Sequence, residues 1–244
     1  ADVNCDGTIN ISDITMLTSF MSGTVSLNCC STSTPSLTYV PDDNFENYLE
    51  NNGMGDGIPL NDNVFTSAID TVTILDVTNW SGSASFSILD MTGIEDFILL
   101  EELYCGENLI ITLDISNNTF LEKLNCRDNQ LSNLDITNNV LFSFLNCEKN
   151  SLTSLDVNNN TSITELRCGD NQLTSLDVSN NLVLIELHCY INQISSLNLT
   201  SNPNLNTLNC GSNNLITTID VSNNLVLEKF WCEDNLLTSL DVSN

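Results

Sequence analysis

Residues 121–131 read Leu-Glu-Lys-Leu-Asn-Cys-Arg-Asp-Asn-Gln-Leu, and the same frame recurs through the second half of the chain. Apolar side chains occupy positions 121, 124, 126 and 131. The cysteine recurs every 21 residues, with one extra residue before the last: Cys105, Cys126, Cys147, Cys168, Cys189, Cys210 and Cys232. An asparagine follows three places after each cysteine: Asn108, Asn129, Asn150, Asn171, Asn192, Asn213 and Asn235. The second half of the chain is therefore a tandem repeat.

The period and the pattern of this repeat predict its fold. A period of about 20–29 residues with the pattern L-x-x-L-x-[apolar]-x-x-N-x-L is typical of a leucine-rich repeat solenoid. Leu124 and Cys126 alternate with polar neighbours, which predicts a short strand with one buried face. Stacked repeats would place these strands about 4.8 Å apart in a curved parallel β-sheet on the concave face, with a mostly irregular convex side. The Asn129 column is expected to form an internal ladder that satisfies backbone groups at the bend.

The charge balance excludes several classes of partner. The 244 residues include 5 Lys and Arg against 32 Asp and Glu, for a net charge of −27. Such a surface repels nucleic acid and anionic membranes, because both are bound through basic side chains on phosphates. No run of about 18 apolar residues is present, so no membrane insertion is expected. The chain shows neither an initiator Met nor a signal peptide, and we expect a processed or excised piece of a longer protein.

The first residues have the spacing of a calcium loop. With Asp2 counted as position 1, Gly7 falls at position 6, where an EF-hand loop turns sharply. Oxygen ligands for one Ca²⁺ fall at positions 1, 3, 5, 7, 9 and 12: Asp2, Asn4, Asp6, Thr8 (through its carbonyl), Asn10 and Asp13. Asp replaces the usual Glu at position 12, and an amphipathic helix pattern follows as far as Gly23. The alternative is an Asx-rich surface turn that binds no metal.

A calcium loop of this kind, followed by the pattern I-x-M-L-x-x-x-M, resembles one half of a type I dockerin. Dockerins carry two such segments, and this chain shows one. The resemblance implies a calcium-binding loop and helix over residues 1–30. Cys5, Cys29 and Cys30 lie here, outside the repeat column. One bridge from Cys5 to Cys29 or Cys30 would leave the third thiol free or paired with another chain.

A linker and a cap are expected between this loop and the repeats. The linker covers residues 31–41, which are rich in Ser and Thr. Asp42 is a good helix N-cap, and Phe45, Tyr48 and Leu49 make one apolar face of a helix that ends near Asn52. A solenoid's first turn would otherwise expose its core, so this helix is predicted to cap it. The cap and irregular first repeats span residues 42–100, and regular repeats span residues 101–244.

The segment Tyr-Val-Pro-Asp-Asp-Asn-Phe-Glu-x-x-Leu at residues 39–49, followed by the tandem repeats, resembles the secreted leucine-rich repeat proteins of the Bacteroidota. The resemblance covers about residues 38–244. Proteins of that type are similar to internalin-like surface solenoids. The resemblance implies a binding or adhesion module that is extracellular or on the outer cell surface.

The cysteine and aspartate columns each allow two interpretations. The cysteines are predicted to be buried, inert thiols, because an apolar core raises the pKa of a thiol. Disulfides between neighbours and a metal site are the alternatives. The aspartates should face solvent, either as a solvated acidic ridge or as a site that divalent cations stabilise. Their column has one asparagine in it: Asp114, Asp135, Asp156, Asp177, Asn198, Asp220 and Asp241.

The outward positions of the strands vary more than the rest of the repeat. Four of the five basic residues, the one histidine and several aromatic residues collect there. Exposed aromatic residues and arginines are common binding anchors, and solenoids bind on their concave sheet. The predicted ligand-binding residues, for a protein or a glycan, are Tyr104, Lys123, Arg127, Phe144, Arg167, His188, Tyr190, Lys229 and Trp231. The alternative is that exposed strand positions are simply free to vary.

No catalytic constellation accompanies these residues. A single histidine has no nucleophile placed to use it, and no phosphate loop or His-rich cluster is present. We therefore expect a non-catalytic module with Ca²⁺ as its one cofactor. The main alternative function is a structural subunit or spacer of a surface fibre, assembled by end-to-end stacking of copies.

Overall fold

The structure is a computed structural model that describes residue 21 and residues 35–241. The chain divides into two units, residues 1–36 and residues 37–244. The predicted calcium ligands lie outside the described residues, as do three cysteines: Asp2, Asn4, Asp6, Thr8, Asn10 and Asp13, with Cys5, Cys29 and Cys30. The second unit contains all of the repeats, and the leucine-rich repeat fold predicted for them is confirmed.

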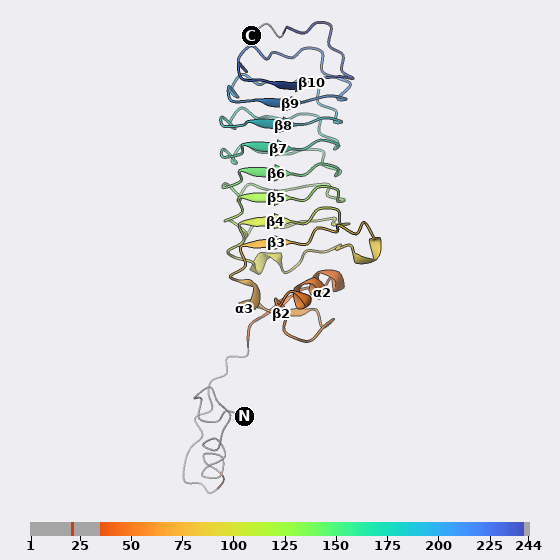
Figure 1. The fold of residues 1–244 in the computed structure, drawn as a ribbon, viewed down its shortest axis with the longest axis vertical. Helices are drawn as coiled ribbons and strands as arrows, with labels where there is room; N and C mark the ends of the chain where they lie inside the picture. Colours follow the sequence, from red (N-terminus) through yellow and green to blue (C-terminus); the bar gives the residue numbers. More distant parts are fainter. Residues whose placement is uncertain (1–20, 22–34, 242–244) are drawn as a thin grey trace. The chain divides into compact units, whose positions relative to one another are not determined.

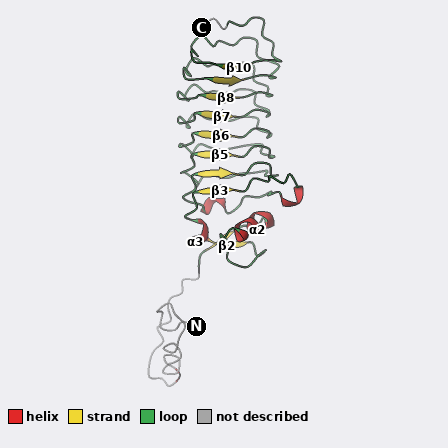
Figure 2. Ribbon diagram, viewed as in Figure 1, coloured by secondary structure: helices red, strands yellow, loops and turns green. Residues whose placement is uncertain are grey.

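Eight short parallel strands stack in sequence order to form one sheet (Figures 1 and 2). Each strand has three residues and pairs in register with the next, so that Leu103 lies opposite Leu124 and Leu124 opposite Leu145. The strands are β3 (Ile74–Asp76), β4 (Glu102–Tyr104), β5 (Lys123–Asn125), β6 (Phe144–Asn146), β7 (Glu165–Arg167), β8 (Glu186–His188), β9 (Thr207–Asn209) and β10 (Lys229–Trp231).

The middle residue of each strand enters the core because side chains alternate across a strand. Leu124 and Leu145 are fully buried in this way. Cys126 and Cys147, two residues further along the chain, point to the same side and are also fully buried. Leu131 and Ile136 pack against them from the return segment. A narrow apolar core therefore runs from turn to turn behind the sheet.

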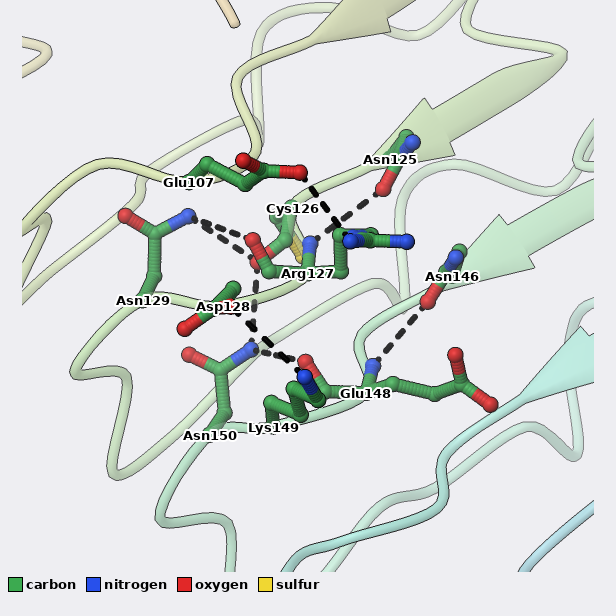
Figure 3. Close-up of polar contacts among 10 residues, drawn as sticks. All are labelled: Glu107, Asn125, Cys126, Arg127, Asp128, Asn129, Asn146, Glu148, Lys149 and Asn150. Atoms are coloured by element: carbon green, nitrogen blue, oxygen red, sulfur yellow. Dashed lines mark hydrogen bonds and ion pairs between the residues drawn. The ribbon is translucent and has the colours of Figure 1, made fainter. Parts of the chain in front are cut away.

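An asparagine ladder closes the bend after each strand, as predicted (Figure 3). Asn129 Nδ2 donates to the carbonyls of Cys105 and Cys126 at 3.0 Å, and Asn129 Oδ1 accepts from the Ile110 N–H at 3.0 Å. Each asparagine of this column thus links its own turn to the preceding one.

A second asparagine ladder lies on the return side of the core and was not predicted. Asn139 Nδ2 donates to the carbonyl of Ile115 at 3.0 Å and to that of Asn118 at 2.9 Å. The Oδ1 atoms of this ladder are buried and have no hydrogen-bond partner among residues 35–241. The ladder consists of Asn118, Asn139, Asn160, Asn181, Asn202 and Asn224.

The chain leaves each strand through a residue in the left-handed conformation, two places after the cysteine. At Asp128, φ is 54°, and its N–H donates to the Glu148 carbonyl of the next turn at 2.9 Å. Non-glycine residues adopt such φ values at a cost, so the bonds between turns hold them there. The equivalent residues are Glu107, Asp128, Lys149, Asp170, Ile191, Ser212 and Asp234.

The N-terminal end of the core is covered by small elements. β1 (Leu37–Tyr39) pairs antiparallel with β2 (Asn63–Phe65), and α3 (Thr66–Ile69) follows β2 directly. α2 (Asp43–Asn51) begins after Asp42, which caps it, as expected. Phe45 of α2 packs against Phe97, with ring centroids 6.4 Å apart. Two 3₁₀ helices, η1 (Ala84–Phe86) and η2 (Ile94–Asp96), lie in the first, irregular turns.

No helix in the part of the chain that the structure describes has the length and apolarity needed to cross a bilayer. The longest of the named helices, α2, has 9 residues. The boundaries predicted at residues 30, 41 and 100 stay predictions.

Candidate functional site

The candidate site is the outward side of the sheet, here called the strand face. It consists of the first and third residues of β4–β10 and the residue that follows each cysteine, because these positions point away from the core. All nine residues predicted to bind a ligand lie on it: Tyr104, Lys123, Arg127, Phe144, Arg167, His188, Tyr190, Lys229 and Trp231.

Most basic side chains of the strand face are paired with acids. Lys123 Nζ lies 2.9 Å from Glu102 Oε1, one strand away. Arg127 Nη2 lies 3.0 Å from Glu107 Oε1 (Figure 3). Because these side chains are around 40% exposed, each pair contributes at most about 1 kcal/mol to stability. Each pair joins side chains of two neighbouring turns.

Arg167 is the centre of a second charged group. Its guanidinium contacts Glu165 and lies 3.7 Å from Glu186 Oε2, which is also 3.7 Å from His188 Nε2. The His188 side chain is only 17% exposed, and its Nε2 has no hydrogen-bond partner among the described residues. His188 is therefore not the exposed anchor that the sequence suggested.

The two tyrosines are also held in place by acids. Tyr104 Oη donates to Glu102 Oε2 at 2.6 Å; burial and this bond raise the pKa of Tyr104 to about 12. The pKa of Tyr190 is also raised to about 12. The main cause is burial, and the charge of Glu148 and a hydrogen bond to it add to the effect. The Tyr190 ring lies over Gly169, where an added Cβ would come within 2.5 Å of it. Gly169 thus makes room for Tyr190 to lie flat.

The strand face has one hollow, of about 380 Å³, among the pockets found in the described chain. Tyr104 and Phe144 lie in its wall, with Lys123 of the strand between them. Ser143, Thr164 and Glu165 complete it. At the other end of the sheet, Trp231 and Lys229 are exposed, and Lys229 makes no ion pair within residues 35–241.

The structure therefore divides the nine predicted residues into groups. Tyr104, Lys123 and Phe144 share the hollow, Arg167 and His188 share Glu186, and Lys229 and Trp231 stand together on β10. Arg127 and Tyr190 stand in the same column, three repeats apart, with Glu148 and Gly169 between them.

Five acidic residues of the strand face were not among the residues predicted to bind a ligand. They are Glu102, Glu148, Glu165, Glu186 and Glu233. The sequence does carry a signal for these ion pairs, which is an acidic residue at the equivalent position of the repeat next to a basic one. Glu102 and Lys123 are such a pair, since they lie opposite each other in the sheet. With four basic and five acidic side chains the strand face is nearly balanced in charge, whereas the whole chain carries −27.

The cysteine column is a buried ladder of free thiols, as predicted. Six of the seven thiols are buried and Cys232 is half-buried, and none of these seven forms a disulfide. Burial raises the pKa of Cys105 to about 12 and raises that of Cys126 well above its usual value. Such thiols are neutral at physiological pH and unsuited to bind metal.

One acidic cluster in the described chain has metal-like spacing, but hydrogen bonds account for its buried member. Carboxylate oxygens of Asp43, Glu46 and Asp62 lie within 4.8 Å of one another. Glu46 is buried and accepts from the N–H groups of Asn61 and Asp62 at 2.9 and 3.1 Å. Its carboxylate therefore anchors the loop before β2.

The aspartate column faces solvent and is held by local hydrogen bonds. Asp135 Oδ1 accepts from the Thr137 N–H at 3.0 Å and from Thr137 Oγ1 at 2.7 Å. These two bonds lower the pKa of Asp135 below its usual value. The same turn occurs at Asp114, Asp177 and Asp220. A role in the turn therefore explains the column without a cation.

The chain was compared with known protein families, curated proteins and solved structures. No family model and no curated protein matches the chain. The functional domain of InlJ from Listeria monocytogenes, which includes a cysteine ladder, is similar over 85% of this chain, at 36% identity and a TM-score of 0.65. This chain spans 50% of that domain. This chain has a cysteine ladder of its own, the column from Cys105 to Cys232.

Two more distant structures share the fold. Internalin C2 from L. monocytogenes has 18% identity and a TM-score of 0.56, over 84% of this chain and 98% of its own. The ectodomain of the Arabidopsis thaliana receptor kinase GASSHO1/SCHENGEN3 has 23% identity and a TM-score of 0.54, over 60% of this chain and 20% of its own. Folds of this kind are usually non-enzymatic binding modules.

Proposed function

We propose that this chain is a non-catalytic binding module, extracellular or on the outer cell surface, that holds a protein ligand on its strand face. The observation that carries the proposal is the gathering of four basic side chains and four large aromatic residues on one nearly neutral face of a chain with a net charge of −27. The return segments repeat the same few residues and offer no comparable variety.

The strand face suits a polypeptide because its anchors are far apart. The hollow between Tyr104 and Phe144 lies on β4–β6, whereas the exposed Trp231 and Lys229 lie on β10. Five strand spacings of about 4.8 Å separate β5 from β10, on the order of 24 Å. A protein surface can reach both anchors at once, and aromatic residues in such positions commonly dominate binding.

The fold also supports a protein ligand. The GASSHO1/SCHENGEN3 ectodomain was solved in complex with CASPARIAN STRIP INTEGRITY FACTOR 2. That ligand belongs to the plant receptor. For this chain it illustrates that a stack of leucine-rich repeats can present side chains to a bound polypeptide.

A site-directed cross-linking experiment tests the proposal. A photo-reactive phenylalanine analogue at position 144 should capture a protein partner, whereas the same analogue at the exposed Phe120 of a return turn should not. Phe144→Ser combined with Trp231→Ser should then weaken binding of that partner at least about tenfold, while Phe120→Ser should not. These variants avoid Arg167 and Tyr190, whose loss would also disturb the packing between turns. Equal capture at positions 120 and 144 would refute the proposal.

We also propose that residues 2–13 bind one Ca²⁺. The support is the ligand spacing in the sequence, from Asp2 to Asp13. The stacking of copies into a fibre remains the alternative function, and sedimentation distinguishes it.

A further inference from the structure

A second pocket lies in the cap, away from the strand face. It is about 360 Å³ in volume and lies between α2 and the loop of residues 77–88 that follows β3. That volume is within the range of small-ligand pockets. One wall is a face of α2 with Asn47, Tyr48 and Asn51, and the rim carries Trp80 and Phe86.

No residue that lines this pocket is charged, although the chain contains 32 acidic residues. α2 itself is acidic, but its acids face elsewhere. Glu46 accepts from the backbone of Asn61, and Glu50 accepts from that of Asp56 at 2.8 Å. The side of the helix toward the pocket carries amides, at Asn44, Asn47 and Asn51. The helix therefore separates its charges from its amides.

These asparagines are not explained by the stability of the helix. Asn is a poor helix former because its side chain competes for backbone hydrogen bonds, yet α2 has three of them in 9 residues, and Asn52 follows as its C-cap. Asn44 Nδ2 donates to the Ser87 carbonyl at 2.8 Å and so ties the helix to the loop. Asn47, Asn51 and Asn52 bond within the helix through part of their amide groups and keep other donor or acceptor capacity toward solvent.

The loop on the other side presents two aromatic residues to solvent. Trp80 is 76% exposed and Phe86 is 66% exposed. The loop is nevertheless well tied, since Asn79 Nδ2 donates to the Ser83 carbonyl at 3.1 Å and to Ser87 Oγ at 2.9 Å. Large aromatic surface held in water on an ordered loop indicates a binding site rather than a folding requirement.

We propose that this pocket binds a neutral carbohydrate. A sugar ring presents a face of C–H groups that packs on an indole or phenyl ring, and a rim of hydroxyls that both donate and accept hydrogen bonds. Asparagine amides match those hydroxyls because they also donate and accept without charge. A cationic ligand would be drawn to the acidic surface instead, and an anionic glycan would be repelled by the net charge of −27. The site is independent of the ligand proposed for the strand face.

The fluorescence of Trp80 provides a direct test. The chain has two tryptophans, Trp80 and Trp231, so Trp231→Phe leaves the pocket indole as the one tryptophan reporter. The full chain would first be applied to an array of neutral, sialylated and sulfated glycans. The neutral oligosaccharide with the strongest signal would then be titrated into the Trp231→Phe protein. We expect saturable binding and a shift of the Trp80 emission to shorter wavelength.

Matched variants complete the test. Trp80→Ala should weaken binding of that oligosaccharide at least about tenfold, because it removes the stacking surface. Asn47→Asp with Asn51→Asp should weaken it similarly by introducing charge at nearly constant shape. Phe120→Ala, an equally drastic change at an exposed aromatic residue outside the pocket, should leave it unchanged. All of these positions are exposed, so each variant should melt within about 2 °C of the parent. Binding only to charged glycans, binding that survives Trp80→Ala, or no binding to any array glycan would overturn the proposal.

Discussion

Asn171→Ala tests whether the asparagine ladder after the strands holds the solenoid together. Asn171 is almost fully buried, and its Nδ2 donates to the carbonyls of Cys147 at 3.0 Å and Cys168 at 3.2 Å. Its Oδ1 accepts from the Leu152 N–H at 3.0 Å. Alanine removes these bonds and leaves the buried Leu152 N–H without a partner, whereas each carbonyl keeps one donor, from Asn150 or from Asn192.

The magnitude follows from the number of groups left without a partner. An unsatisfied buried backbone group costs about 1–3 kcal/mol, so the loss of the one partner of the Leu152 N–H should cost about 2 kcal/mol. For a unit of this size, 1 kcal/mol corresponds to about 2–4 °C in Tm, which predicts a fall of about 4–8 °C for 2 kcal/mol. The Leu152 amide should also exchange its hydrogen faster.

Thermal melting followed by circular dichroism measures the effect, and Asn159→Ala is the matched control. Asn159 lies in the return segment just before β7 and is exposed, so its replacement should change Tm by less than about 2 °C. If Asn171→Ala and Asn159→Ala melt together, the ladder does not stabilise the stack and the reasoning is wrong.

Four further predictions follow from the structure. Gly169→Ala should push the Tyr190 ring outward and lower the Tyr190 pKa from about 12 toward its usual 10.0, which spectrophotometric titration measures; an unchanged titration would contradict the packing. Burial raises the pKa of Cys105 to about 12, so above about pH 9 the unfolded chain loses thiol protons that the folded chain keeps. The free energy of unfolding, measured in urea, should therefore fall as the pH rises above about 9. A free energy of unfolding that rises with pH would exclude neutral buried thiols. The full chain should bind one Ca²⁺ by calorimetry and lose it in Asp2→Ala with Asp6→Ala, whereas equal titrations of both proteins would dismiss the calcium loop. Sedimentation velocity should show a concentration-independent monomer; filaments that appear under non-reducing conditions would favour the fibre alternative instead.

The sequence was sufficient to predict the stack itself. An apolar residue at every equivalent position, a cysteine every 21 residues and an asparagine three places later can be satisfied together only if each turn buries the same face against the next. The helix after Asp42 could also be predicted from the sequence, because an N-cap and the spacing of Phe45 and Leu49 are local signals. Burial of the thiols followed from the same period.

Only the tertiary structure decided which outward side chains meet. Contacts such as Lys123 with Glu102, or Tyr190 over Gly169, join residues one repeat apart, and their geometry depends on the stagger and pitch of the stack. The left-handed Ile191 and the second asparagine ladder are likewise imposed by bonds between turns, against local preference. The cap pocket forms where α2 and the loop after β3 approach each other, although residues 52–76 separate them in the chain, and periodicity carries no information on such a contact. A repeat thus specifies its own copies, whereas contacts between different parts of the chain require the folded geometry.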